Sequence, residues 1–127
     1  MGDLSEHFSA TEFACGCGCG FGTRPGDVSA DLLVMLEAVR KARGTALRPT
    51  SGCRCEVYNR RVGGVENSEH MIGEAADIWA PGSAAKLSIV EAAVACGVHR
   101  IGVGRTYVHL GVSAHHPPGL WGYNEPC

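Results

Sequence analysis

The sequence predicts an α+β fold, in which helices cover one face of a small antiparallel sheet. Two observations predict it. Amphipathic stretches with helix caps run from Ser29 to Gly44 and from Ser83 to Cys96, and short runs of strand-forming residues lie between and after them. The chain is 45% hydrophobic and 19% charged, as in an ordinary globular protein. Because a core of this size suits one domain and would be too small if divided, residues 1–127 are expected to form a single domain.

Capping signals mark the first two helices. Ser9 and Glu12 form a capping box, which predicts that a short helix begins there. Ser29 can cap the next helix through its hydroxyl, and Gly44 supplies the left-handed residue that ends it. The apolar residues of this second helix share one face: Leu32, Met35, Leu36 and Val39.

Two further helices are expected. One runs from about Glu56 to Val62 and is closed by Gly63 and Gly64. The other runs from Ser83 to Cys96 and stops at Gly97. Three of its apolar residues are expected to point inward: Leu87, Val90 and Val94.

The expected strands are short and separated by turns. They are Thr45–Thr50, Ala75–Ala80, Ile101–Val103 and Tyr107–Val112. Ser51 and Gly52 should turn the chain after the first strand, and the last two strands should form a hairpin. Because strand side chains alternate between faces, Asp77 is expected to share a face with Ala75 and Trp79.

Charge and hydropathy argue against two classes of partner. A net charge of -2 offers no broad cationic surface, so we expect no nucleic-acid partner. No apolar run approaches the roughly 20 residues that span a bilayer, so we expect no membrane segment. Residues 1–10 lack a basic stretch followed by an apolar one, so we expect the chain to be made in the cytoplasm without a secretion signal.

The chain contains seven cysteines, and three of them alternate with glycine. This spacing of Cys15, Cys17 and Cys19 is tighter than the gap of about two to four residues that is usual in structural zinc sites. Three interpretations stay open: a glycine-rich turn with buried or disulfide-linked thiols, a second, thiolate-bound metal, or a thiol redox or metal-storage element. The odd number leaves at least one cysteine unpaired.

Two histidines and one aspartate have the chemistry of zinc ligands. His70 and Asp77 are too far apart in sequence to lie on adjacent helical turns, so Gly73 must fold the chain back if they are to meet. His109 lies in the Tyr107–Val112 strand and joins them if that strand neighbours the Asp77 strand. Such a set would bind one zinc ion and leave a fourth position open for water, as catalytic sites do.

The sequence around these residues resembles that of a known family. Ser68-x-His70-x-x-Gly73-x-Ala75-x-Asp77, with a later strand that carries His109, looks like the zinc signature shared by D-Ala-D-Ala carboxypeptidases, related dipeptidases and phage endolysins. The hedgehog amino-terminal signalling domain is a fold relative. Further stretches resemble the small bacterial and prophage branch, so the likeness covers most of the chain: His7-Phe8-Ser9-x-x-Glu12-Phe13, the Cys-Gly tract, Ser51-Gly52-Cys53-Arg54-Cys55, Tyr58-Asn59 and Val62-Gly63-Gly64.

The resemblance implies a zinc metallopeptidase that hydrolyses the peptide part of peptidoglycan, either as a D-Ala-D-Ala carboxypeptidase or as an endolysin-type endopeptidase. It implies a single zinc ion held by His70, Asp77 and His109. It also implies that Arg54 holds substrate or developing negative charge and that Ser68 contacts substrate. Such an enzyme acts on the cell wall after export or lysis.

The chain departs from the family pattern where a proton acceptor for the attacking water is expected. Better-known members carry an acidic residue where this chain has Thr106, and the small branch often carries Asp where it has Gly111. His116, with His115 beside it, is the predicted substitute, because an imidazole titrates near neutral pH, although both can also belong to an exposed loop. Glu69 is a less favoured substitute that we expect to be solvated. A second hypothesis is a catalytically inactive module that binds zinc and a cell-wall peptide.

Two further expectations concern the surroundings of the site. Four aromatic residues either border a cleft for a stem peptide or belong to the core: Trp79, Tyr107, Trp121 and Tyr123. Cys53 stands where the family usually has an aromatic residue. Either this position packs differently or Cys53 pairs with another thiol, for which Cys127 is a plausible partner.

Overall fold

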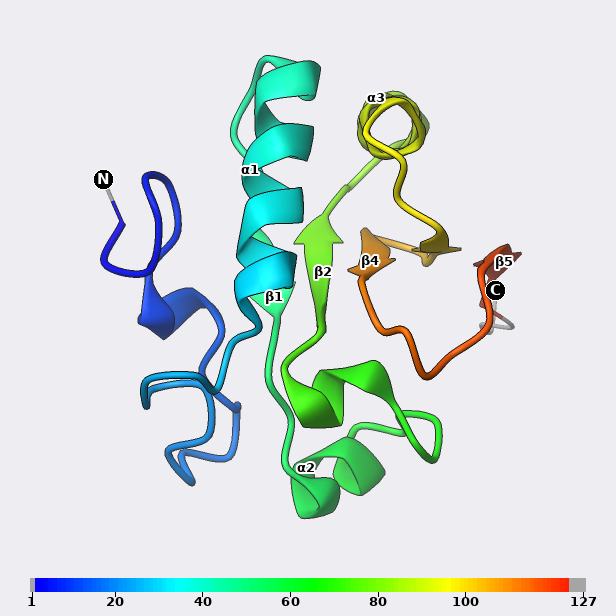
Figure 1. The fold of residues 1–127 in the computed structure, drawn as a ribbon. Coiled ribbons are helices and arrows are strands. Elements are labelled where there is room, and N and C mark those ends of the chain that lie inside the picture. Colours follow the sequence, from blue (N-terminus) through cyan, green and yellow to red (C-terminus); the bar gives the residue numbers. More distant parts are fainter. Residues whose placement is uncertain (1, 124–127) are drawn as a thin grey trace.

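The computed structural model describes residues 2–123 and has the α+β fold that the sequence predicts (Figure 1). Its helices are α1 (Ala30–Arg43), α2 (Glu56–Arg61) and α3 (Ser83–Ala95), with 3-10 helices η1 (Ala10–Glu12) and η2 (Glu69–Ile72). Its strands are β1 (Pro49–Ser51), β2 (Ala75–Trp79), β3 (Arg100–Val103), β4 (Tyr107–Gly111) and β5 (Gly119–Gly122). They form one sheet in the order β1-β2-β4-β3-β5.

The sheet is mixed, so the prediction of a purely antiparallel sheet is wrong at one edge. β1, β2, β4 and β3 pair antiparallel, whereas β5 runs parallel to β3. The sequence Gly-Leu-Trp-Gly of β5 has little strand propensity, and this strand was not expected. Its Trp121 lies over Gly102 of β3, where an added Cβ would come 2.6 Å from the indole nitrogen. Close packing on a glycine therefore holds this edge strand in place.

One face of the sheet carries the hydrophobic core. Ile78 of β2 and Val108 and Leu110 of β4 are fully buried together with Leu36 of α1 and Ile89 of α3. Burial of each such side chain contributes about 1.5–3 kcal/mol. Figure 1 shows α1 and α3 on this side of the sheet, and the two helices contact each other. The opposite face of the central strands is left for polar residues. Within residues 2–123, no helix is both long and apolar enough to span a membrane.

The predicted caps are present. The Ser29 hydroxyl accepts a hydrogen bond from the Leu32 N–H at 3.3 Å, and Gly44 ends α1 with a φ of 82°. The Glu12 carboxylate accepts from the Ser9 N–H at 2.9 Å at the start of η1. Helix α2 begins at Glu56 as expected. These local signals therefore fixed the helix boundaries to within one residue.

The predicted inward face of α3 is wrong at two of its three residues. Leu87 and Val94 are 59% and 61% exposed, whereas Val90 is partly buried against the core and Ile89 and Ala93 are fully buried. The helix is apolar on most of its surface, so hydrophobicity alone does not select a face. The small Ala93 lets the helix approach the core closely, and Leu87 and Val94 are left outside.

The first strand and the cysteines also differ from some expectations. β1 begins only at Pro49 and includes Ser51, which pairs with Asp77 instead of forming a turn. All six cysteines within residues 2–123 are free, and Cys53 is buried without a disulfide partner among them. The suggested partner Cys127 lies outside the described residues.

Candidate metal centre

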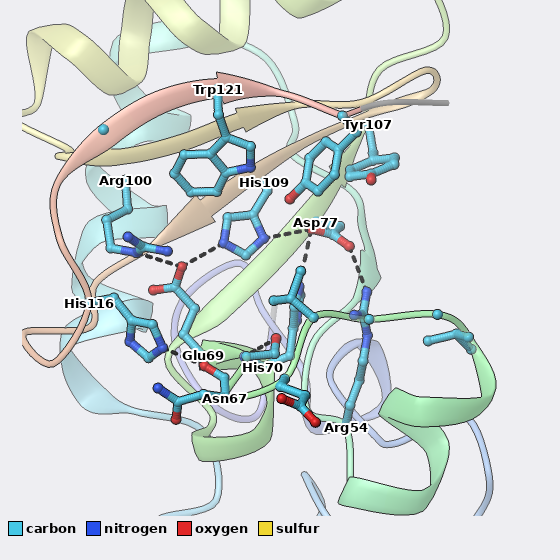
Figure 2. A pocket seen from close by; sticks show the side chains of 18 of the residues that line it. Arg54, Asn67, Glu69, His70, Asp77, Arg100, Tyr107, His109, His116 and Trp121 are labelled. Carbon is cyan, nitrogen blue, oxygen red and sulfur yellow. Dashed lines mark hydrogen bonds and ion pairs between the residues drawn. The ribbon is translucent and has the colours of Figure 1, made fainter. Parts of the chain in front are cut away.

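The three predicted metal ligands meet on the polar face of the sheet. His70 lies in η2, and Gly73 follows with a φ of 69°, which turns the chain into β2. Asp77 of β2 and His109 of β4 are direct partners in the ladder, so their side chains emerge side by side. All three residues are buried. In Figure 2, His70 lies below the side chains of Asp77 and His109.

The spacing of the three side chains fits one metal ion. One candidate ligand atom of each lies within 4.8 Å of the other two. Asp77 Oδ1 is 3.2 Å from His70 Nε2 and 3.0 Å from His109 Nδ1. Zinc bonds of about 2.0–2.2 Å in a tetrahedron separate neighbouring ligand atoms by about 3.3–3.6 Å, so only a small expansion is needed.

A hydrogen bond from the ring nitrogen that points away from Asp77 fixes the orientation of each imidazole. His70 Nδ1 donates to the Gly52 carbonyl at 2.6 Å, and His109 Nε2 donates to Glu69 Oε2 at 2.7 Å. Metal-bound histidines typically have such an acceptor on the nitrogen that does not bind the metal. Asp77 Oδ1 can only accept hydrogen bonds, so without a cation His70 Nε2 and His109 Nδ1 would both need protons to contact it. Each buried ring would then carry two protons and a positive charge. A divalent ion between these three atoms removes that need, so the donor set fits zinc.

The charges of this site are strongly coupled. Burial alone would raise the pKa of Asp77, but hydrogen bonds and charges from His109 and His70 hold it well below its usual range. Burial would lower the pKa of His109, but Asp77 and Glu69 raise it. Burial also opposes ionisation of Glu69, yet His109 and Arg100 lower its pKa. Both carboxylates are therefore charged at neutral pH.

Glu69 is not solvated, and that expectation is wrong. It is 2% exposed, and besides His109 it accepts from Arg100 Nε at 2.8 Å and from the Ser113 N–H at 3.3 Å. Arg100 in turn lies under the Trp121 ring, 4.9 Å from its centroid. Glu69 is therefore a fixed carboxylate that orients His109 (Figure 2).

Gly111 makes room for this carboxylate. A Cβ added at Gly111 would lie 2.1 Å from Glu69 Oε1. The acidic side chain missing from β4 is thus replaced, in the same space, by one from the residue before His70. The absence of a side chain at Gly111 and the carboxylate of Glu69 therefore belong together, and considering these two residues as a pair could have revealed the role of Glu69.

Arg54 and Ser68 hold the ligands in place. Arg54 Nη2 donates to Asp77 Oδ2 at 3.0 Å, and this is the carboxylate oxygen that the two histidines do not contact. Arg54 Nε donates to the Ser51 hydroxyl at 3.0 Å, and Nη1 donates to Asn59 Oδ1 at 3.3 Å. The Ser68 hydroxyl accepts from the His70 N–H at 3.2 Å and so caps η2.

A cavity of about 460 Å³ opens onto the metal centre. The three candidate ligands line it together with Arg54, Ser68 and His116. Of the four aromatic residues considered for a cleft, Tyr107, Trp121 and Tyr123 line it and Trp79 does not. His115 and Thr106 are exposed and are not part of its lining within the described residues. Glu66, an exposed carboxylate that we did not consider from the sequence, is part of it.

His116 bridges two loops at the edge of this cavity. Its Nε2 donates to the Asn67 carbonyl at 2.5 Å, and its Nδ1 accepts from the Ser113 hydroxyl at 2.6 Å. The alternative of an exposed loop therefore describes His115, whereas His116 is partly buried.

Comparison with known proteins agrees with this geometry. Among curated proteins, no match to the chain was found. A family model described as peptidase M15 matches residues 6–111, which include all three candidate metal ligands. This match covers well over half of the chain, and so the chain belongs to the peptidase M15 family, the zinc D-Ala-D-Ala carboxypeptidase-like family.

Proposed function

We propose that the chain is a zinc-dependent peptidase that cleaves the peptide part of peptidoglycan, as a D-Ala-D-Ala carboxypeptidase or an endolysin-type endopeptidase at the cell wall. The observation that carries the proposal is the convergence of His70, Asp77 and His109 at the floor of an open cavity. Three protein ligands with access from a cavity are typical of catalytic zinc, whereas structural zinc sites are closed.

The residues around the ion have separate tasks in this proposal. A zinc ion held by His70, Asp77 and His109 supplies Lewis acidity. Arg54 forms an ion pair with Asp77, and its three hydrogen bonds leave two of the five N–H donors of a guanidinium without a partner among the described residues. We propose that these donors bind the substrate carboxylate or the charge that develops on the scissile carbonyl oxygen.

The proton acceptor is proposed from the residues that line the cavity. His116 is the first candidate, although one of its two hydrogen bonds must open before it can take a proton. Glu66 is the second, because it is exposed and forms no hydrogen bond or ion pair with any described residue. Glu69 is a weaker candidate, since His109, Arg100 and Ser113 already engage its carboxylate.

The cavity suits a short peptide. Its volume of about 460 Å³ lies in the range of about 300–1,000 Å³ that is usual for small-ligand sites. Tyr107 and Tyr123 lie with their rings 5.3 Å apart on its wall, and Trp121 lies 5.5 Å from the His109 ring. Aromatic rings combine apolar area with a polar edge, as a peptide backbone with small side chains requires.

The test mixes zinc-loaded protein with a peptide that ends in D-Ala-D-Ala or with whole peptidoglycan. Hydrolysis is measured as the release of new amino groups. We expect release that a chelator abolishes, that added zinc restores, and that Asp77→Ala lacks. His116→Ala and Glu66→Gln identify the proton acceptor, because its loss lowers kcat far more than it changes KM. If the wild-type protein releases no amine from either substrate between pH 5 and 9, the peptidase proposal is wrong.

A second candidate function is a zinc-binding module that holds a cell-wall peptide without cutting it. One observation favours it: neither Thr106 nor Gly111 offers an acid, and Glu69 is fully engaged. Zinc-dependent binding of the D-Ala-D-Ala peptide without cleavage would support this function over the first.

A further inference from the structure

A second cluster of metal-ligating side chains lies outside the cavity. Cys15, Cys17, Cys19 and Cys55 place their sulfur atoms within 4.8 Å of one another. Three of these residues come from the glycine-rich tract near the amino terminus, and Cys55 immediately precedes α2. None of the four lines the cavity of the His70 centre within the described residues.

The sulfur spacing fits ligands around one ion. Sγ of Cys17 is 3.5 Å from that of Cys15 and 3.6 Å from that of Cys55. Zinc–sulfur bonds of about 2.3 Å in a tetrahedron separate neighbouring sulfur atoms by about 3.8 Å. A disulfide requires about 2.0 Å, and all four cysteines are free.

The glycines of the Cys-Gly tract let its backbone bring the sulfur atoms of the tract together. Gly18 and Gly20 have φ values of 78° and 96°, which L-residues rarely adopt, and they reverse the chain between and after the cysteines. This explains how an alternating Cys-Gly tract can gather its thiols despite a spacing tighter than usual. Gly16 lies under the Tyr58 ring, where a Cβ would come 2.3 Å from the hydroxyl oxygen, and so the tract packs closely on α2.

Backbone donors already point at two of the sulfurs. The Cys55 N–H donates to Cys15 Sγ at 3.4 Å, and the Tyr58 N–H donates to Cys55 Sγ at 3.4 Å. Hydrogen bonds of this kind stabilise thiolates, the form that binds metal. Four thiolates side by side repel one another unless a cation lies between them.

We propose that Cys15, Cys17, Cys19 and Cys55 bind a structural zinc ion, distinct from the ion of the His70 centre. A tetrahedral set of four thiolates selects zinc or iron and leaves no position for substrate, so its role is structural. The ion ties a tract without regular secondary structure to the start of α2. Because Arg54 directly precedes Cys55 and its N–H donates to the His70 carbonyl at 3.0 Å, the same ion anchors one wall of the cavity.

Metal analysis of the whole chain, purified with zinc in the medium, tests the proposal. We expect two zinc ions per chain in the wild type, one in Cys17→Ser and one in Asp77→Ala. Cys96→Ser is the matched control, because Cys96 is an exposed thiol outside the cluster, and it should retain two ions. With cobalt in place of zinc, a thiolate-to-metal charge-transfer band should be present in Asp77→Ala and absent in Cys17→Ser.

The wild-type protein provides a readout that no folding defect can obscure. Titration with a mercurial reagent in the presence of a zinc-sensitive dye should release one zinc ion as the cluster thiols react. The proposal would be overturned by two zinc ions in Cys17→Ser or by no zinc release with the mercurial reagent. It would also be overturned by iron in place of zinc or by a disulfide within the cluster. None of these outcomes depends on peptidase activity, so the failure of one proposal does not imply the failure of the other.

Discussion

Transfer of a carboxylate from η2 to β4 gives the sharpest prediction. Glu69→Ala removes the acceptor of His109 Nε2 and the ion-pair partner of Arg100. Loss of such a partner behind a metal-bound histidine lowers metal affinity about 10–100-fold, or about 1.4–2.8 kcal/mol. The Arg100 side chain is only 14% exposed, so we also expect the zinc-free protein to lose about 3–5 kcal/mol of stability.

The reciprocal change should restore the site. Gly111 lies in β4 without a positive φ, and the three atoms nearest to a Cβ added there all belong to the Glu69 carboxylate. The double variant Glu69→Ala, Gly111→Asp places a carboxylate in the vacated space and should recover most of the lost affinity. Gly111→Asp alone should instead weaken zinc binding and destabilise the fold, because two carboxylates would compete for one position.

Zinc affinity is measured by competition with a chromophoric chelator, with every variant in a Cys17→Ser background so that a single ion is titrated. Glu91→Gln, an exposed glutamate of α3, is the matched control and should leave the affinity unchanged. Unchanged affinity in Glu69→Ala, or the same loss with and without Gly111→Asp, would refute the role we assign to Glu69.

Three other predictions follow from the same geometry. Arg54→Ala leaves Asp77 Oδ2 without its buried ion-pair partner and should cost about 3–5 kcal/mol of unfolding free energy by urea denaturation, whereas an effect under about 1 kcal/mol would mean that the pair is solvated. Leu36→Ala, at a fully buried position of α1, should cost about 2–5 kcal/mol in the same assay, and a smaller loss would place α1 outside the core. In the zinc-free protein the lowered pKa values of Asp77 and Glu69 stabilise the fold above about pH 4, and this stabilisation is lost as the pH falls. The raised pKa of His109 stabilises the fold below about pH 6.5, and this stabilisation is lost as the pH rises. Urea midpoints with chelator should therefore be highest between these values, and a midpoint that rises steadily to pH 9 would contradict the coupling.

The sequence predicted the centre of the fold well because strand alternation is a strong local rule. Asp77 and His109 were expected to meet if their strands were neighbours, and the two residues are direct ladder partners. The turn at Gly73 and the caps of α1 also followed from local residue chemistry. These features depend on a few adjacent residues, which a sequence displays directly.

Features that depend on distant partners were missed. Glu69 is held by Arg100, His109 and Ser113, which lie 31, 40 and 44 residues away, and nothing local distinguishes it from a solvated glutamate. The edge strand β5 pairs with β3, about 20 residues earlier in the chain, where Trp121 packs on Gly102. On α3 the alanines allow several faces to pack, so only the position of the sheet decides which is buried.

The most direct test of the metal centre is a crystal structure of the zinc-loaded protein with anomalous diffraction recorded at the zinc edge. We predict a peak about 2.0–2.2 Å from His70 Nε2, Asp77 Oδ1 and His109 Nδ1, with Glu69 still bonded to His109 Nε2. A peak on the Nε2 side of His109 with Glu69 as a ligand, or no peak among these three residues, would contradict the proposed centre.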